Sequence, residues 1–278
     1  MIKINDLHYQ YGRKAKVFDS LTLNIEKGHI VGILGKNGVG KSTLLKCICG
    51  LLHPQKGNIY IGNVKAGERK PYILSNLFLL PEDLYVPDIK PMDYAGTYGR
   101  FYPKFNFESF LACANEFEIP INYRMGEMSY GQKKKTMIAF GLACNTNLIM
   151  MDEPTNGLDI TSKSQFRKLI SQAINGDNSI LISTHQIKDV ENLVDRVLIL
   201  NEGKVLLDES IDTISRKLHF GFTSELVNDI PFLFSEESLR GYNYIIPGDG
   251  ISESKVDIEL LYKAVMHHPK QLSQIIKN

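Results

Sequence analysis

Short apolar runs alternate with helical patterns along most of the chain. Near its start, Leu21–Ile25 and His29–Leu34 are typical of short strands, and a helical pattern from Lys41 to Cys49 interrupts the β-like sequence. Residues 1–70 are therefore predicted to form a mixed sheet that encloses one strand–helix unit.

The middle of the chain changes character twice. From about Pro91 to Ala143 the periodicity is helical, which predicts an inserted helical subdomain. Two buried-strand runs follow, Asn147–Met151 and Ser179–Ser183, with the helix-like stretch Thr161–Ile174 between them. This alternation is typical of a parallel, doubly wound sheet, so the expected fold class is α/β.

After about Asp208 the pattern changes again. Leu218–Thr223 and Tyr242–Ile246 are predicted strands, and Gly248-Asp249-Gly250 is a predicted turn. A helical stripe of apolar side chains follows at Val256, Leu260, Leu261, Ala264 and Val265. These elements predict a small α+β appendage without a catalytic constellation.

Charge and hydropathy exclude several kinds of partner. The 278 residues include 32 Lys and Arg against 31 Asp and Glu, so no overall field would hold nucleic acid or an acidic membrane surface. No stretch approaches the roughly 20 apolar residues that span a bilayer. The N-terminal sequence lacks the apolar region of an export signal. We expect no nucleic acid partner, no direct membrane insertion and a cytosolic location.

The cysteines have no paired metal-ligand spacing. Cys47 and Cys49 fall within a predicted helix beside apolar residues, which favours packing over zinc. We expect all four thiols to be reduced core groups, at Cys47, Cys49, Cys113 and Cys144.

A glycine-rich segment carries the strongest chemical signal. Gly35-Lys36-Asn37-Gly38-Val39-Gly40-Lys41-Ser42 matches G-x-x-x-x-G-K-[ST] between a strand-like and a helix-like run. Glycines let backbone N–H groups surround phosphates, while Lys41 reaches the terminal phosphates and Ser42 ligates magnesium. The alternative is an ordinary glycine-rich turn, which this context disfavours. The predicted ATP contacts are Gly35, Asn37, Gly38, Gly40, Lys41, Ser42 and Thr43.

Two carboxylates end a buried strand. In an open parallel sheet the carboxyl ends of strands gather at the ligand edge, where Asp152 and Glu153 follow the apolar run Leu148–Met151. Asp152 is predicted to hold magnesium, directly or through water. Glu153 is predicted to orient or deprotonate the attacking water, as a hydrolase requires. A lone Asp-Glu pair would otherwise be a polar strand end.

Met128-Ser129-Tyr130-Gly131-Gln132 completes a set of motifs in a fixed order. With this segment, residues 1–208 resemble the nucleotide-binding domain of an ABC ATPase. The motifs are the P-loop, Pro81-Glu82, Ser129–Gln132, Asp152-Glu153-Pro154, Gly157-Leu158-Asp159 and Ser183-Thr184-His185. The resemblance implies a mixed sheet with a RecA-like core and a helical subdomain at about 82–143, leaving 209–278 as a C-terminal accessory domain.

The resemblance also implies a shared site. Ser129, Gly131 and Gln132 resemble the signature that caps the γ-phosphate of ATP held by a second copy, so the expected assembly is a head-to-tail homodimer. Asp159 resembles the loop aspartate at that dimer contact. On their own, Ser129 would be an ordinary helix N-cap and Lys133–Lys135 a solvated helix start.

Two further residues receive roles from the resemblance. His185 resembles the switch histidine that hydrogen-bonds the γ-phosphate and steadies the water held by Glu153, although a lone histidine at a strand end is usually structural. Tyr11 resembles the aromatic residue that stacks on adenine. Its alternative is an edge-strand residue that packs on the core, and Tyr9 is a weaker candidate for the stacking role.

Two positions depart from the family pattern. Glu82 stands where the family usually has glutamine; it can still ligate magnesium or water but brings a negative charge into the site. Tyr130 replaces the first signature glycine and adds bulk, whereas Gly131 is kept.

These observations predict the ATPase subunit of an ABC transporter. Such a subunit hydrolyses ATP, acts through separate membrane permease subunits and lies at the inner face of the cell membrane. The permease groove is expected around Glu82–Pro91, and the motif style resembles bacterial exporter-type ATPases. A soluble ABC ATPase of a cytosolic assembly, such as iron–sulfur biogenesis, is the alternative. A small-molecule kinase would have no use for Ser129–Gln132 or His185.

Overall fold

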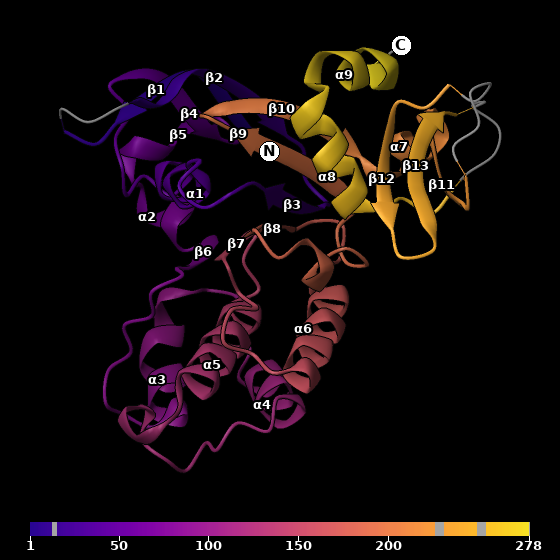
Figure 1. The fold of residues 1–278 in the computed structure, drawn as a ribbon. Coiled ribbons are helices and arrows are strands. Elements are labelled where there is room, and N and C mark those ends of the chain that lie inside the picture. The colour runs from indigo at the N-terminus through magenta and orange to yellow at the C-terminus, as the bar shows by residue number, and fades with distance from the viewer. Residues whose placement is uncertain (13–15, 226–230, 249–253, 278) are drawn as a thin grey trace.

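The computed structural model describes residues 1–12, 16–225, 231–248 and 254–277. Of the predicted turn Gly248-Asp249-Gly250, Asp249 and Gly250 lie outside the described residues. These residues form three sheets. Figure 1 shows a group of helices at one end of the molecule and further helices near the C-terminus.

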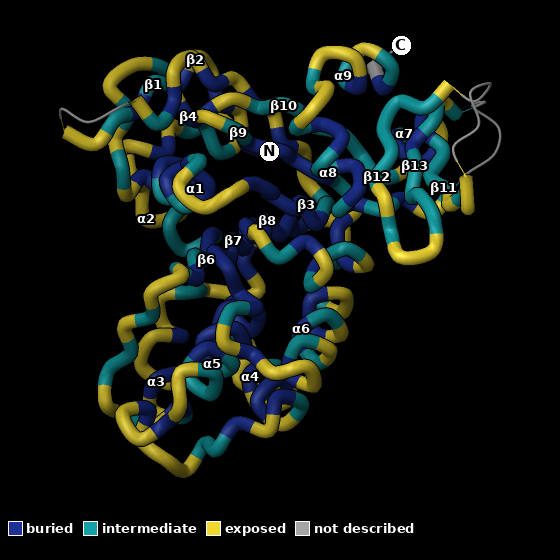
Figure 2. The backbone as a smooth tube through the Cα atoms, in the orientation of Figure 1, coloured by how far each residue is buried: buried dark blue, intermediate teal, exposed yellow. Residues whose placement is uncertain are grey.

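A six-stranded mixed sheet forms the centre, in the order β10-β9-β3-β8-β7-β6. All neighbouring pairs are parallel except β10 with β9. Every residue of β7 and β8 is buried, which explains their continuous apolar sequences (Figure 2). The predicted strands at 147–151 and 179–183 are confirmed within one residue. The six strands are β3 (Ile30–Leu34), β6 (Leu77–Leu80), β7 (Leu148–Asp152), β8 (Ser179–Thr184), β9 (Arg196–Asn201) and β10 (Lys204–Ser210).

A separate antiparallel sheet has the order β2-β1-β4-β5. The strands are β1 (Ile2–Gln10), β2 (Lys16–Ile25), β4 (Lys56–Ile61) and β5 (Val64–Lys65). The prediction of one mixed sheet within residues 1–70 is wrong, because β3 joins the central sheet and the other strands pair among themselves. β3 is buried throughout, whereas much of β1 alternates between buried and exposed positions.

Helix α1 (Lys41–Ile48) lies between the two sheets and ends one residue earlier than predicted. Its Leu44 and Leu45 share one apolar cluster with Val31 of the central sheet and Ile4 of the antiparallel sheet. Burial on both sides fixes the start of this helix, and therefore the loop before it, relative to the carboxyl end of β3.

The helical subdomain lies at the end of the molecule away from the antiparallel sheet (Figure 1). Its core includes Phe140, whose ring centroid lies 4.9 Å from that of Tyr94 and 6.0 Å from that of Phe78. The predicted helical character of 91–143 is confirmed. The α-helices before residue 208 and after α1 are α2 (Pro71–Leu74), α3 (Pro91–Tyr98), α4 (Phe107–Glu116), α5 (Tyr130–Ala143) and α6 (Ile160–Ala173). The 3-10 helices are η1 (Ala66–Glu68), η2 (Gly99–Phe101), η3 (Met125–Glu127) and η4 (Ile187–Asp189).

The C-terminal region contains a three-stranded antiparallel sheet, β11-β13-β12. Its elements are α7 (Ile211–Lys217), β11 (Leu218–Thr223), β12 (Phe234–Ser238), β13 (Gly241–Pro247), α8 (Ile258–His267) and α9 (Pro269–Lys277). The two predicted strands and the predicted helix are confirmed. Leu261 and Val265 of α8 belong to the same apolar cluster as Val197 and Ile199 of the central sheet. The division into domains at residue 208 stays a prediction.

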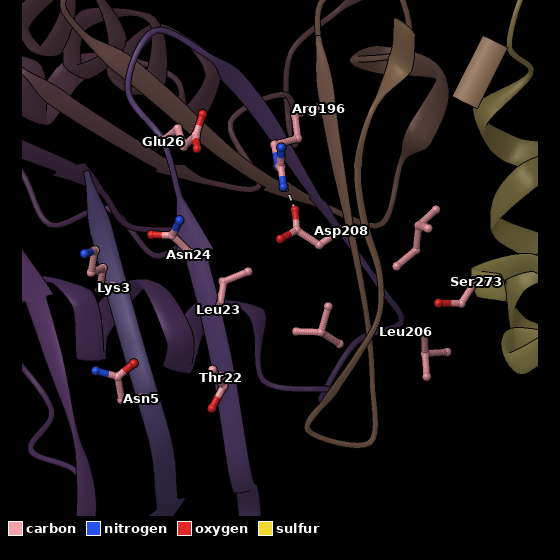
Figure 3. A pocket seen from close by; sticks show the side chains of 12 residues that line it. Lys3, Asn5, Thr22, Leu23, Asn24, Glu26, Arg196, Leu206, Asp208 and Ser273 are labelled. Carbon is pink, nitrogen blue, oxygen red and sulfur yellow. Dashed lines mark hydrogen bonds and ion pairs between the residues drawn. The ribbon is translucent and has the colours of Figure 1, made fainter. Parts of the chain in front are cut away.

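A cavity of ≈ 590 Å³ lies between the edge strands β2 and β10 and helix α9 (Figure 3). An ion pair between Arg196 Nε and Asp208 Oδ1, 2.7 Å apart, lies in its wall, and Ser273 enters from α9. None of its lining residues belongs to the predicted ATP site.

Candidate active site

The P-loop joins β3 to α1 and depends on two glycines with left-handed backbone. Gly38 has φ 83° and Gly40 has φ 110°. A Cβ on Gly40 would also lie 2.9 Å from side-chain atoms of Phe18 and Val17. Larger residues are strained at both positions, so the loop can take this shape only with glycine there.

A pocket of ≈ 440 Å³ lies in front of this loop. It brings together residues from distant parts of the sequence, as expected for a site at the carboxyl edge of a parallel sheet. The lining residues are Tyr11, Val17, Asn37, Gly38, Gly40, Lys41, Ser42, Thr43, Glu82 and Glu153. All of these except Val17 are predicted ATP or magnesium contacts or catalytic residues, and Gly35 and Asp152 are not in the lining.

Lys41 is held at the back of the pocket, with a side chain that is 5% exposed. Its Nζ donates to the carbonyl oxygens of Gly35, at 2.8 Å, and Lys36, at 3.3 Å. Nζ also lies 3.4 Å from Oε1 of Glu153. A buried ammonium group so placed offers a positive charge to whatever anion enters the loop.

Glu153 is the centre of a hydrogen-bond network. Its carboxylate Oε1 accepts from the backbone N–H of His185 at 3.0 Å and lies 2.8 Å from His185 Nδ1. Oε2 accepts from the Thr184 hydroxyl at 3.0 Å. The contact places His185 beside Glu153, and its predicted role of steadying the water held by Glu153 stays a prediction. No role for Thr184 was derived from the sequence, although it lies within the Ser183-Thr184-His185 motif.

Asp152 lies beside this network, 3% exposed and paired in register with Ser183 of β8. One carboxylate oxygen accepts from the Ser183 hydroxyl. Among the described residues, no Lys, Arg or His side chain forms an ion pair with the buried Asp152 carboxylate. Hydroxyl and carboxylate oxygens are the donors that magnesium prefers, and Ser42, Asp152 and Glu82 therefore fit such an ion.

Tyr11 stands at the open side of the pocket and is 42% exposed. Its hydroxyl lies 3.1 Å from Thr43 Oγ1, and Tyr9 packs edge-on against its ring with 5.0 Å between centroids. Tyr9 itself is buried. The arrangement leaves part of the Tyr11 ring open beside the P-loop.

The signature residues lie outside the pocket, at the start of α5. The Ser129 hydroxyl accepts from the Gln132 N–H at 3.2 Å, and Gln132 Oε1 accepts from the Ser129 N–H at 2.9 Å. This is a capping box, so the N-cap interpretation of Ser129 is confirmed. Gly131 packs against the next loop, because a Cβ there would lie 2.9 Å from the carbonyl oxygen of Gly157.

Asp159 caps α6 and also lies outside the pocket. Its Oδ1 accepts from the Ser162 N–H at 2.7 Å, and the hydrogen bonds from Ser162 hold the pKa of this carboxyl below its usual range. The side chain is exposed.

Lys134 contradicts the expectation of a solvated helix start for Lys133–Lys135. It is 0% exposed, and its Nζ donates to the carbonyl oxygens of Glu153, at 2.6 Å, and Asn156, at 3.3 Å. Burial lowers the pKa of Lys134, and Glu82 is the foremost of four carboxylates that oppose this effect. Helical spacing does not distinguish Lys134 from its two lysine neighbours, because Met137, Ile138 and Ala139, four residues after each lysine, are all buried.

The two departures from the family pattern are in contact with each other. The Tyr130 hydroxyl donates to the main-chain oxygen of Glu82 at 2.7 Å. Nζ of Lys134 lies 5.4 Å from the centroid of the Tyr130 ring. The start of α5 is therefore joined both to the Glu82 loop and to Glu153.

The C-terminal region reaches the other side of the P-loop. Tyr262 of α8 lines a cavity of ≈ 280 Å³ together with Lys36, Asn37 and His185. Next to it, Nζ of Lys188 lies 3.2 Å from Oε2 of Glu259. The appendage thus packs beside the loop that carries His185, which the sequence did not predict.

Three comparisons identify relatives of the chain. A family model described as ABC transporter matches residues 18–156. The ABC transporter ATP-binding protein NatA of Bacillus subtilis is 30% identical over 87% of this chain and 99% of its own length. The bacitracin transport ATP-binding protein BcrA of Bacillus licheniformis is 31% identical over 90% of this chain and 83% of its own length.

Solved structures agree with these relatives. A dimeric structure of the ATP-binding cassette MJ0796, in a post-hydrolysis state bound to ADP and Pi, matches with a TM-score of 0.67 and 25% identity. The match covers 76% of this chain and 98% of that one. In the part of the chain that the structure describes, no helix is both long enough and apolar enough to cross a membrane. The chain belongs to the ABC transporter family, as one of its ATP-binding and ATP-hydrolysing subunits.

Proposed function

We propose that this chain binds magnesium–ATP on its own P-loop and hydrolyses it with Glu153 as the general base. The observation that carries the proposal is the buried contact of Lys41 with Glu153 at the P-loop pocket, with Nδ1 of His185 2.8 Å from the Glu153 carboxylate. The loop N–H groups and Lys41 would bind the β- and γ-phosphates. The adenine would stack on the open face of Tyr11.

The hydrogen bonds of Glu153 fit the role of base. Donors from Thr184 and His185 fix both carboxylate oxygens, which orients the group before substrate arrives. A positioned carboxylate can take a proton from the attacking water, while the His185 ring contacts the γ-phosphate. Ser42 and Asp152, with Glu82, would hold magnesium, which neutralises phosphate charge when bound.

A second copy of the chain would complete the site. Ser129, Gly131, Gln132 and Asp159 all lie outside the pocket of their own chain, and Ser129 and Asp159 are exposed. Residues so placed are available to a partner's nucleotide. The dimeric MJ0796 cassette supports this arrangement, and we propose a head-to-tail homodimer that closes on ATP.

The permease would dock beside the Glu82 loop. The segment Glu82–Pro91 runs from the P-loop pocket, which Glu82 lines, to the first residue of α3, and Tyr85 within it is 93% exposed. An exposed aromatic side chain is typical of a contact surface. The subunit would then act at the inner face of the membrane, through separate permease subunits.

The names of the relatives favour a transporter over a cytosolic assembly or a kinase. NatA is named as a transporter ATP-binding protein and BcrA as a bacitracin transport protein. Export as the direction of transport stays a prediction.

The decisive experiment is the oligomeric state of Glu153→Gln, measured by size exclusion with light scattering, with and without magnesium–ATP. We expect monomer without nucleotide and dimer with it, because the variant binds ATP but does not hydrolyse it. The double variant Lys41→Ala/Glu153→Gln is the matched control and should stay monomeric. A persistent monomer with ATP binding confirmed would contradict the shared site.

A further inference from the structure

We propose that Lys134 is a positioning residue for ATP hydrolysis, which transmits the position of the signature helix α5 to the main chain of Glu153 and balances the charge of Glu82. The inference rests on the proposed function, because it assumes that Glu153 is the base. It concerns a residue whose two lysine neighbours, Lys133 and Lys135, are only partly buried.

The first support is the set of groups to which Lys134 donates hydrogen bonds. A fully buried ammonium group is costly unless it is hydrogen-bonded, and the described residues offer Lys134 no ion pair. Its hydrogen bonds instead go to two carbonyl oxygens that follow β7, those of Glu153 and Asn156. Lys134 therefore fixes the backbone of the loop that carries the base.

The second support is the conformation of Glu153. Its φ of 45° lies in the left-handed region, which is unusual for a residue with a side chain. Three main-chain hydrogen bonds hold it: its N–H donates to the Ser183 carbonyl oxygen at 2.9 Å, and its carbonyl oxygen accepts from Lys134 Nζ at 2.6 Å and from the Asn156 N–H at 3.3 Å. This conformation directs the carboxylate toward Thr184 and His185. Loss of the Lys134 contact would leave the carbonyl oxygen of Glu153 with only the longer hydrogen bond from the Asn156 N–H.

The third support is charge. Four carboxylates act on Lys134, those of Glu82, Glu153, Asp152 and Asp83. Nζ of Lys134 lies 5.4 Å from the centroid of the Tyr130 ring, whose hydroxyl is bonded to the main chain of Glu82, whereas Lys41 lies beside Glu153 from the P-loop. The extra negative charge of Glu82 is thus opposed by a buried positive charge on the same helix as the signature.

The fourth support is the position on α5. Lys134 lies one turn after Tyr130, and Tyr130 is bonded to the Glu82 loop. A second copy that contacts Ser129 or Gln132 would push on the start of this helix. Because α5 is a continuous helix, the displacement would reach Lys134 and, through it, the carbonyl of Glu153.

The test compares Lys134→Met with Lys134→Arg and with Lys133→Met in the full chain. Lys134→Met keeps the length of the side chain but removes its donors. We expect kcat to fall by about 10- to 100-fold, the effect of losing a hydrogen bond to a charged group. The Kd for ATP should stay within about twofold. Lys134→Arg should recover much of kcat, and Lys133→Met should match the unmodified chain.

A charge-balanced pair provides a second readout. Lys134→Gln alone should lower kcat, and adding Glu82→Gln should restore part of it, because the unopposed carboxylate is then removed. Unchanged kcat in Lys134→Met, or equal loss of ATP binding and kcat, would overturn the inference. If Lys134→Met does not fold, the comparison of Lys134→Gln with and without Glu82→Gln tests the inference instead. No hydrolysis by the unmodified chain would instead overturn the proposed function.

Discussion

Nζ of Lys41 and Oε1 of Glu153 lie 3.4 Å apart, with side chains that are 5% and 4% exposed. The lysine proposed to bind phosphate and the proposed base therefore form a buried ion pair. An incoming triphosphate must share Lys41 with the carboxylate, so the two functions can be separated by single substitutions.

Glu153→Gln should retain ATP binding and lose turnover. Glutamine preserves the shape of the side chain but cannot take a proton, and general base catalysis contributes roughly 10²- to 10⁴-fold. Phosphate release measures turnover, and a fluorescent ATP analogue measures binding. Turnover at the unmodified rate would rule out Glu153 as the base.

Lys41→Ala should weaken ATP binding by roughly 10- to 100-fold, the range for losing a hydrogen bond to a charged group. The same titration with Lys46→Ala, which changes another lysine of α1, provides the control. Equal affinities for the two variants would contradict the assignment of the P-loop.

Gly141→Ala should destabilise the chain, because the new Cβ would lie 2.2 Å from Cε1 of Phe78. Overpacking of this kind costs about 1–3 kcal/mol, which a urea titration of the unfolding free energy would detect. Gly96→Ala in α3 is the matched control, since nothing lies within 4 Å of its Cβ. Similar urea midpoints for the Gly141→Ala and Gly96→Ala variants would show that Phe78 can move to make room for the added methyl group.

The buried thiols should resist labelling. Burial raises the pKa of Cys47 and of Cys49 to about 12, from an ordinary value of 9.0, because the thiolate cannot be solvated. At pH 8 a thiol reagent should react slowly with the folded chain and rapidly in denaturant. The unfolded chain releases these protons above pH 9.0 while the folded chain retains them, so stability should fall there. Fast labelling of the folded chain would contradict the packing.

Buried apolar runs made much of the fold predictable. β7 and β8 are buried along their whole length, so their sequences stand out and their ends are nearly correct. β12 and α9 were not predicted, because Phe234–Ser238 is largely polar and Pro269–Lys277 has only three apolar side chains after its proline. Their structure depends on the surface they pack against.

The candidate site was also predictable only in part. Motif spacing predicted that Lys41, Ser42 and Glu153 would meet, and the pocket brings them together. The contact of Lys134 with the Glu153 carbonyl could not be read from spacing, because it joins two elements through a backbone atom. A run of three lysines does not show which of them is buried against a loop and which are partly exposed.

The packing of α8 sets an order of events during synthesis. Leu261 and Val265 complete the apolar cluster that contains Val197 and Ile199, and Tyr262 lies beside the P-loop. Domains emerge from the ribosome with their N-terminal parts first. The P-loop is therefore synthesised more than two hundred residues before α8, the helix that packs beside it. This side of the P-loop is covered only after α8 has been synthesised.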